Sequence, residues 1–280
     1  MSCSDQDYEY LRELVLAQSA NLIAPSRNAL FETRLAPVAR LAGAQNLEGL
    51  VSMLQTDRPA RLHRAVAEAM TVNETSFFRD LWPWDAMRQT VIPKLIEVNR
   101  QRKRLRIWSA ASSTGQEAYS LAMLFKEDFP ELNRWDVKIL GTDISEAVVE
   151  YARKGCYRRL EVNRGLPVKM LMRYFERDGE VWQINESLRA MCDFRFSNLC
   201  DPPVGLPIFD LVLLRNVLLY FPPQERRRVL AQAHRQLQPS GYLLLGNAEQ
   251  AEDSTELFKA EFGAGCYFYR PVPDPGRTTS

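Results

Sequence analysis

The residues best suited to chemistry lie in the segment 73–80, which reads NETSFFRD and combines polar side chains with two adjacent aromatic rings. Further along, residues 106–120 read RIWSAASSTGQEAYS, which predicts a strand, a turn of small residues and the start of a helix. In an α/β sheet a ligand lies beyond the carboxyl ends of the strands, where helix amides are free to bind it. The two segments together indicate a cofactor held between two parts of one protein.

The turn Ser109–Gly115 contains one glycine and neither GxGxxG nor GxxxxGK[ST]. Both of those sequences bind phosphates, so the turn disfavours dinucleotides and nucleoside triphosphates. The ligand that remains compatible with the turn is a nucleoside without phosphates, such as S-adenosylmethionine. Thr114 and Glu117 also fit a T-x-x-E capping box, in which Glu117 would only cap its own helix, and this alternative stays open.

Three further polar residues are expected near that turn. Asp143 ends the second predicted strand, where a carboxylate can accept hydrogen bonds from ribose hydroxyls; the alternative is that it caps the helix following Ser145. Arg215 and Asn216 interrupt the apolar run FDLVLLRNVLLY, and buried polar groups need partners. They either face the same crevice as Asp143 or bond to neighbouring loops within the protein.

The elements that must position these residues fall into two groups. Residues 1 to about 70 show helical spacing, as in Leu11, Leu14 and Val15, and predict a small helical domain. From Leu105 onward, short apolar runs alternate with helical segments, which predicts an α/β fold with an open, mostly parallel sheet. The predicted strands are 107–111, 137–142, 209–214, 242–245 and, at the edge, 266–269, and the predicted helices are 116–128, 145–154 and 224–238.

We expect four regions along the chain: a helical domain at 1–72, a linker and cofactor-lid segment at 73–104, a sheet domain at 105–272 and a disordered polar tail at 273–280. The sheet pattern breaks between about 155 and 195. There a helix at 166–177 precedes alternating segments at 180–184 and 193–196, which predict a small inserted antiparallel subdomain.

The composition is that of an ordinary soluble globular protein. The 280 residues are 46% hydrophobic and 25% charged, and the net charge of +1 gives no global field to attract nucleic acid or an acidic membrane. There is no apolar run of about 18 residues, and early acidic residues argue against a signal peptide, so we expect a cytoplasmic protein without membrane insertion. Five scattered cysteines without a CxxC pair, and two histidines, argue against a disulfide framework and a metal centre.

Taken together, the motifs resemble those of the CheR family, the chemotaxis receptor methyltransferases, which esterify receptor glutamates with S-adenosylmethionine. The resemblance extends from about Leu11 to Tyr269 and rests on five motifs in the family's order: NETSFFRD, RIWSAASSTGQEAYS, LGTDIS, FDLVLLRNVLLYF and GYLLLGNAE. It implies a Rossmann-like methyltransferase sheet, an N-terminal helical domain and an inserted antiparallel β-subdomain. It also implies cofactor contacts at nine matching positions: Asn73, Thr75, Arg79, Glu117, Asp143, Asn198, Leu199, Arg215 and Asn216.

The resemblance implies an acceptor site as well. Arg79 and Tyr220 match family positions near the transferred methyl group, where they would orient the acceptor carboxylate through charge-assisted and hydroxyl hydrogen bonds. A glutamate carboxylate is already ionised at neutral pH, so its attack on the methyl group needs alignment and desolvation but no general base. The implied partners are the cytoplasmic helical bundles of chemoreceptors, and we expect the enzyme to be a monomer.

The chain departs from the family's pattern at several positions. Ser112 replaces a frequent cysteine and Ala118 a usual proline, and both changes should leave cofactor binding intact. Residues 246–249, GNAE, replace a more common GHSE, which puts an acceptor role for Asn247 or Ala248 in doubt. The turn at 177–180 is several residues shorter than the glycine-rich loop of relatives that tether to a receptor's C-terminal pentapeptide, so we expect no such tether.

Two other functions stay open. A small-molecule methyltransferase of the same fold would keep the cofactor residues but would not need the helical domain. A regulatory module that senses S-adenosylmethionine would keep Asp143 and Asn216 but could dispense with Arg79 and Tyr220. The presence of both residues favours an enzyme.

Overall fold

The structure is a computed structural model that describes residues 3–57, 60–251 and 254–273. Apart from Pro273, the tail expected to be disordered lies outside the described residues. By its internal contacts the chain divides into two compact units, Met1–Val72 with Tyr220–Arg226, and Asn73–Leu219 with Arg227–Ser280. Within the described part, no helix is both long enough and apolar enough to cross a membrane.

The first unit is helical, and its elements are α1 (Asp5–Ser19), η1 (Pro25–Arg27), α2 (Asn28–Leu41), α3 (Leu47–Asp57) and α4 (Ala60–Met70). Ser4 caps α1 through a capping box with Asp7, and Asn46 accepts a hydrogen bond from the Gly49 amide at the start of α3. Leu11, Leu14 and Val15, which recur at helical spacing, are buried in one apolar cluster with Leu35. The N-terminal helices predicted from that spacing are confirmed.

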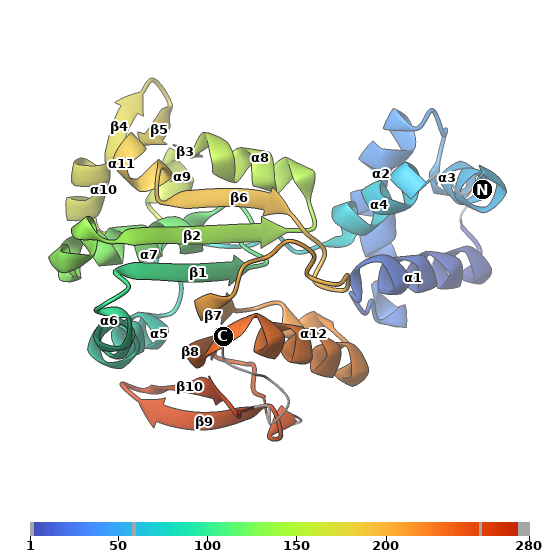
Figure 1. Cartoon of the computed structure of the whole chain (residues 1–280). Coiled ribbons are helices and arrows are strands. Elements are labelled where there is room, and N and C mark those ends of the chain that lie inside the picture. Colours follow the sequence, from blue (N-terminus) through green and yellow to red (C-terminus); the bar gives the residue numbers. More distant parts are fainter. Residues whose placement is uncertain (1–2, 58–59, 252–253, 274–280) are drawn as a thin grey trace. The chain divides into compact units, whose positions relative to one another are not determined.

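The second unit is built on a seven-stranded sheet in the order β6-β2-β1-β7-β8-β10-β9 (Figure 1). Its strands are β1 (Arg104–Ala110), β2 (Asp136–Asp143), β6 (Cys192–Phe196), β7 (Phe209–Leu214), β8 (Leu237–Leu245), β9 (Phe258–Gly263) and β10 (Cys266–Pro271). The first five strands of that order run parallel, and β10 pairs antiparallel with β8 and β9. The predicted mostly parallel sheet is therefore confirmed.

The edge of the sheet differs from the prediction. The segment 266–269, expected at the edge, lies in β10 between β8 and β9, and β9 forms the edge instead. Only Phe258 of β9 is fully buried, while Lys259 and the nearby Glu261 are charged. A charged edge strand pairs on one side only and avoids aggregation, so it lacks the apolar run from which a strand is predicted.

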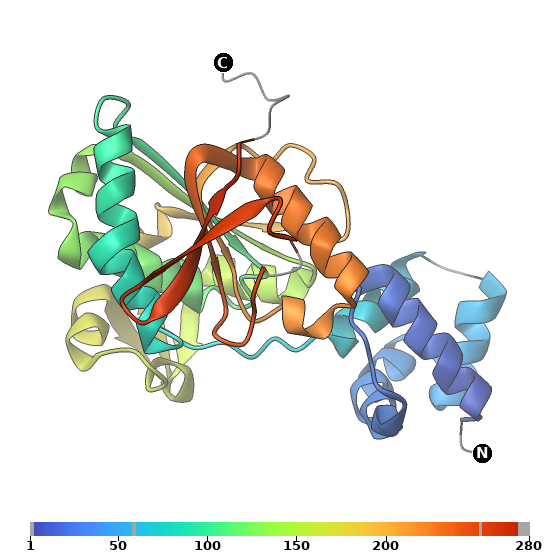
Figure 2. The same cartoon turned by 90° about the horizontal axis from the view of Figure 1, so that it is seen from below.

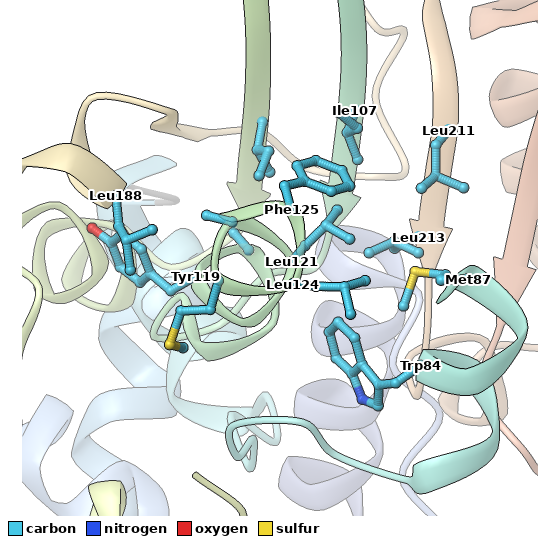
Figure 3. Close-up of a cluster of buried hydrophobic side chains, with 14 of the residues drawn as sticks. Trp84, Met87, Ile107, Tyr119, Leu121, Leu124, Phe125, Leu188, Leu211 and Leu213 are labelled. Carbon is cyan, nitrogen blue, oxygen red and sulfur yellow. The ribbon is translucent and has the colours of Figure 1, made fainter. Parts of the chain in front are cut away.

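The helices of the second unit include α5 (Leu81–Ala86), a π-helical stretch η2 (Met87–Val91), α6 (Ile92–Asn99), α7 (Gln116–Asp128), η3 (Pro130–Arg134) and α8 (Glu146–Lys154). The residues of η4 (Leu218–Tyr220) and α12 (Pro223–Gln236) are divided between the two units. Figure 3 shows Leu121 and Phe125 of α7 packed toward Ile107 of β1 and Leu213 of β7. Because α7 is buried along most of its length, its first residues are held close to the ends of β1 and β7.

The segment 73–104 is not the linker that we expected. It is helical from Leu81 to Asn99, and Met87, Ile92 and Leu95 are fully buried in the core of the second unit. Their spacing of three to five residues places them on one face of a helix, which is buried here against the sheet. Residues 73–80 are therefore followed directly by helices that are packed in the core, which fixes the C-terminal end of this motif.

The predicted antiparallel insertion is confirmed, and it forms a separate three-stranded sheet in the order β3-β5-β4. Its elements are β3 (Cys156–Arg158), α9 (Arg159–Val162), α10 (Val168–Tyr174), β4 (Phe175–Asp178), β5 (Val181–Ile184) and α11 (Glu186–Arg189). Figure 1 shows the insertion on the β6 side of the main sheet, away from β9 and β10, and in Figure 2 it is the yellow segment. The assignment of 193–196 to this insertion was wrong, because β6 pairs parallel with β2 in the main sheet. Alternating exposure around the buried Phe194 occurs equally in an edge strand of either sheet.

Candidate functional site

The candidate site lies at the carboxyl edge of the parallel strands. Ala110, the last residue of β1, pairs with Thr142 of β2 and with Leu214, the last residue of β7, which in turn pairs with Leu245 at the end of β8. The loops that follow these four strands therefore begin side by side. They carry the motif residues that the sequence places after each strand, as expected for a ligand site in this kind of sheet.

The turn after β1 is hydrogen-bonded to the end of β2 and to the NETSFFRD segment through its backbone and hydroxyl groups. The Ser112 amide donates to the Thr142 carbonyl at 2.9 Å, and the Ser113 hydroxyl donates to the Asn73 carbonyl at 2.8 Å. Ala111 and Ser113 have left-handed backbone angles, with φ of 55° and 49°. Such angles cost energy in residues with a side chain and persist where the surroundings enforce them, often at ligand sites.

Asp143 is buried at the end of β2, and its carboxylate is held by two backbone amides. Oδ2 accepts from the Ser113 amide at 2.9 Å and Oδ1 from the Ser145 amide at 3.1 Å. Burial raises the pKa of Asp143, and these amide hydrogen bonds oppose that rise. The bond to Ser145, the N-cap residue of α8, partly agrees with the capping alternative. Each oxygen still has a second lone pair, so the carboxylate can also accept ribose hydroxyls.

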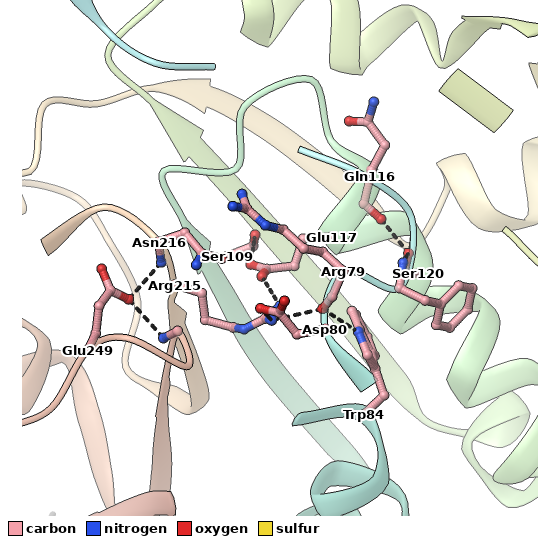
Figure 4. A network of polar contacts seen from close by, with 12 residues as sticks. Arg79, Asp80, Trp84, Ser109, Gln116, Glu117, Ser120, Arg215, Asn216 and Glu249 are labelled. Carbon is pink, nitrogen blue, oxygen red and sulfur yellow. Dashed lines mark hydrogen bonds and ion pairs between the residues drawn. The ribbon is translucent and has the colours of Figure 1, made fainter. Parts of the chain in front are cut away.

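A buried ionic network joins three parts of the chain (Figure 4). The Arg215 side chain is 1% exposed; its Nη1 lies 2.8 Å from Glu117 Oε2 and its Nη2 lies 3.1 Å from Asp80 Oδ2. Glu117 also accepts from the Ser109 hydroxyl at 2.7 Å. Arg215 makes the contacts of the internal-network alternative, and its contact with the cofactor stays a prediction. The capping alternative for Glu117 is wrong, because α7 follows Gly115 without a side-chain cap.

The three ion-paired side chains, counted without the nearby Arg79 guanidinium, carry a surplus of negative charge. Two carboxylates, Glu117 and Asp80, surround one guanidinium, which gives a formal sum of −2 + 1 = −1. The Arg215 Nε is buried and has no hydrogen-bond partner among the described residues. A site of this kind suits a ligand that carries a positive charge together with polar groups of its own. S-adenosylmethionine, with a sulfonium, an ammonium and a ribose, fits these residues.

The backbone of Arg79 is held by the same network. Its carbonyl accepts from Arg215 Nη2 at 2.9 Å and from Trp84 Nε1 at 3.0 Å. Its guanidinium is half-buried, and Nη1 donates to the Glu74 carbonyl at 2.8 Å. Figure 4 shows the Arg79 side chain extending from the network toward Glu117 and Ser109.

The two aromatic rings of NETSFFRD pack within the protein. Phe77 is fully buried and makes edge contacts with Tyr157 and Phe175, at ring-centroid distances of 5.1 and 5.6 Å. Phe78 packs against Trp84 at 5.1 Å, and its amide donates to the Ser120 hydroxyl at 3.0 Å. These contacts are those of wall and core residues, so the rings position the polar residues on either side of them.

The remaining expected residues lie on loops of the two units. Asn73 is exposed and Thr75 half-buried; Asn198 and Leu199 follow β6, where the Ser197 amide donates to the Asp143 carbonyl at 2.9 Å. All nine residues expected to contact the cofactor belong to the second unit. Tyr220 ends η4 and belongs by its contacts to the first unit, where its carbonyl accepts from the Leu22 amide at 2.9 Å.

The sequence reasoning assigned no role to Glu249, which belongs to the same edge. This carboxylate is 7% exposed and accepts three backbone amides, from Asn216 at 2.6 Å, Gly246 at 2.8 Å and Leu219 at 3.2 Å. An acidic residue shortly after the buried run YLLLG is the signal that could have found it, because a carboxylate near a strand end needs donors.

This fold, with an anionic site that can accept a ribose but offers no phosphate cradle, is that of an S-adenosylmethionine-dependent methyltransferase. Residues 73–264 match the family described as CheR methyltransferase, SAM binding domain. The chain is 38% identical to chemotaxis protein methyltransferase 1 of Pseudomonas aeruginosa, over 89% of this chain and 92% of that protein. It is 36% identical to chemotaxis protein methyltransferase Cher2 of Pseudomonas putida, with the same shares covered. The chemotaxis protein methyltransferase of Vibrio parahaemolyticus is 34% identical, over 92% of this chain and 94% of that protein. The chain belongs to the CheR methyltransferase family.

Proposed function

We propose that this methyltransferase acts in the cytoplasm on glutamate side chains in the cytoplasmic helical bundles of chemoreceptors. The products are glutamate methyl esters and S-adenosylhomocysteine. The observation that carries the proposal is Arg79: its carbonyl is held by Arg215 and Trp84, while its guanidinium is partly open at the carboxyl edge of the sheet. A cation in this position suits an incoming carboxylate.

Besides Arg79, the other eight expected residues and Asp80 bind the cofactor according to their chemistry. Asp143 accepts the ribose hydroxyls, and the negative surplus of Glu117, Asp80 and Arg215 complements the cationic end of the cofactor. Asn73 and Thr75 form the part of NETSFFRD that covers the cofactor, and Asn198, Leu199 and Asn216 line the loops beside it. When bound, S-adenosylmethionine supplies an electrophilic methyl group on its sulfonium.

The acceptor needs orientation rather than activation. A glutamate carboxylate is ionised at neutral pH, so no residue has to remove a proton from it. Arg79 and the Tyr220 hydroxyl align the carboxylate with the methyl group and exclude water from it. Binding that anion more tightly in the ground state would not accelerate transfer, so the two side chains act through geometry.

Transfer of a radiolabelled methyl group to receptor cytoplasmic domains, followed by release of the label with base, tests this function. Arg79→Ala should lower the rate about 100-fold or more, because alignment of the acceptor is lost. Arg88→Ala is the matched control: this arginine is also partly exposed on a nearby helix, but it pairs with Asp85 and Asp128. Unchanged turnover in Arg79→Ala would rule out its role.

We also propose that the enzyme acts as a monomer and that it binds its receptor without a C-terminal pentapeptide tether. The absence of a tether is supported by the turn between β4 and β5, which consists of Gly179 and Glu180 alone. So short a turn offers little backbone for pairing with a peptide. In calorimetry, a peptide ending in a receptor pentapeptide should show no binding; micromolar affinity would contradict the proposal.

A further inference from the structure

Glu249 connects two loops of the site through backbone atoms. Its Oε2 accepts from the Asn216 amide at 2.6 Å and from the Gly246 amide at 2.8 Å, and its Oε1 accepts from the Leu219 amide at 3.2 Å. Asn216 lies in the loop after β7 and Leu219 in the following helix η4, whereas Gly246 and Glu249 belong to the loop after β8. A buried carboxylate that accepts three amides makes strong, charge-assisted hydrogen bonds.

The shortest of these bonds is made to a residue with an unusual backbone conformation. Asn216 has a φ of 59°, in the left-handed region that residues with a side chain avoid unless their surroundings enforce it. The two loops also touch directly, because a Cβ added at Gly246 would lie 2.6 Å from Glu249 Oε2 and 2.8 Å from the Asn216 amide nitrogen. Figure 4 shows Glu249 facing Asn216 on the side opposite the Arg215 network.

We propose that Glu249 is a positioning residue for cofactor binding. It holds the Asn216 backbone in its left-handed conformation and thereby fixes where the Asn216 side-chain amide points at the carboxyl edge. This inference rests on the proposed assignment of Asn216 to the cofactor. Glu249 itself need not touch the cofactor, because its lone pairs are directed at the three amides.

Glu249→Gln tests the inference with almost no change in shape. A glutamine has one acceptor oxygen, and its NH₂ group must face at least one of the three amide donors. The Asn216 conformation therefore loses part of its support, and we expect the Kd for S-adenosylhomocysteine to rise about tenfold in calorimetry. The KM for S-adenosylmethionine should rise in parallel, while kcat at saturating cofactor changes less than about threefold.

Asp210→Asn is the matched control. Asp210 is also 7% exposed, and its carboxylate accepts from the Arg106 amide at 2.7 Å and from Asn99 Nδ2 at 3.2 Å, but it lies at the opposite end of β7. Its replacement should alter stability and leave the Kd unchanged. If Asp210→Asn weakened binding as much as Glu249→Gln, the effect would be a general loss of stability and the inference would be wrong.

Asn216→Ala separates this inference from the proposed site. If Asn216→Ala weakens binding and Glu249→Gln does not, the positioning role fails while the cofactor site stands. If Asn216→Ala leaves the Kd unchanged, Asn216 is not a cofactor contact and both assignments fail. Should Glu249→Gln not fold, Glu249→Asp keeps the charge but is too short to reach all three amides, and an unchanged Kd in that variant would overturn the inference.

Discussion

Arg215 is an almost fully buried cation held by carboxylates from two distant parts of the chain, Asp80 of NETSFFRD and Glu117 at the start of α7. Removing one partner of such a group leaves charge without compensation and costs more than an exposed ion pair contributes. The arginine thus links the first motif to the helix that follows the cofactor turn, and changes at any of the three residues should affect the same site.

At the residue scale we therefore expect Glu117→Gln to weaken S-adenosylmethionine binding about tenfold, equivalent to one charge-assisted hydrogen bond, because the formal charge of the network rises from −1 to 0. Glu127→Gln is the control, since Glu127 also lies on α7, is similarly buried and pairs with Lys169 and Arg173 away from the site. Titration calorimetry of both variants decides the matter. Equal losses of affinity would show that the charge of the network has no special role.

At the scale of elements, the insertion touches NETSFFRD through the backbone. Gly165, between α9 and α10, has a φ of 84°, and a Cβ added there would lie 2.0 Å from the Phe77 carbonyl oxygen. Gly179, in the β4–β5 turn, also has a positive φ of 56°, but a Cβ there would meet nothing within 4 Å. Both glycines therefore require a left-handed backbone conformation, but only Gly165 contacts another segment, the backbone of Phe77.

This pair predicts different outcomes for the same substitution. Alanine at either position costs about 1 kcal/mol of stability through the left-handed backbone. Gly165→Ala should in addition displace Phe77 and the residues after it, so it should weaken cofactor binding severalfold, whereas Gly179→Ala should not. Urea unfolding and calorimetry measure the two effects separately. Normal cofactor affinity in a folded Gly165→Ala protein would show that the contact does not position the motif.

The sequence patterns predicted some elements of this fold better than others, for physical reasons. β7 and α7 were predicted at their observed bounds because all of β7 and the stretch 118–125 of α7 are buried, which gives long, mainly apolar runs. The charged edge strand β9 gave no such run, and the alternation in β6 did not reveal its partner. At the site, Asp143 and Arg215 were found as polar residues at strand ends. Glu249 was not assigned a role, although it follows a buried run, because its partners are backbone amides, which are donors whatever the residue type.

At the scale of the whole molecule, the two units have separate apolar cores, and all five tryptophans lie in the second. Tryptophan fluorescence therefore reports on the sheet unit, whereas far-UV circular dichroism reports on the helices of both. S-adenosylhomocysteine at about 100 times its Kd should raise the fluorescence midpoint of thermal unfolding by roughly 5–10 °C. Part of the dichroism signal should not move. Equal shifts of both signals would mean that the two units unfold together. ATP is the control ligand and should shift neither signal, since the turn after β1 has no phosphate-binding sequence.

The contrast between Gly165 and Gly179 has a consequence for how the insertion can vary in length. The connection between α9 and α10 is fixed, because Gly165 leaves room for no more than a hydrogen atom beside the Phe77 carbonyl oxygen. At the β4–β5 turn, a Cβ added to Gly179 would meet no other atom within 4 Å. Loops can therefore be lengthened or grafted between Asp178 and Val181 while the cofactor site stays as it is. The fold thus provides one place where a new recognition segment can be added to an unchanged catalyst.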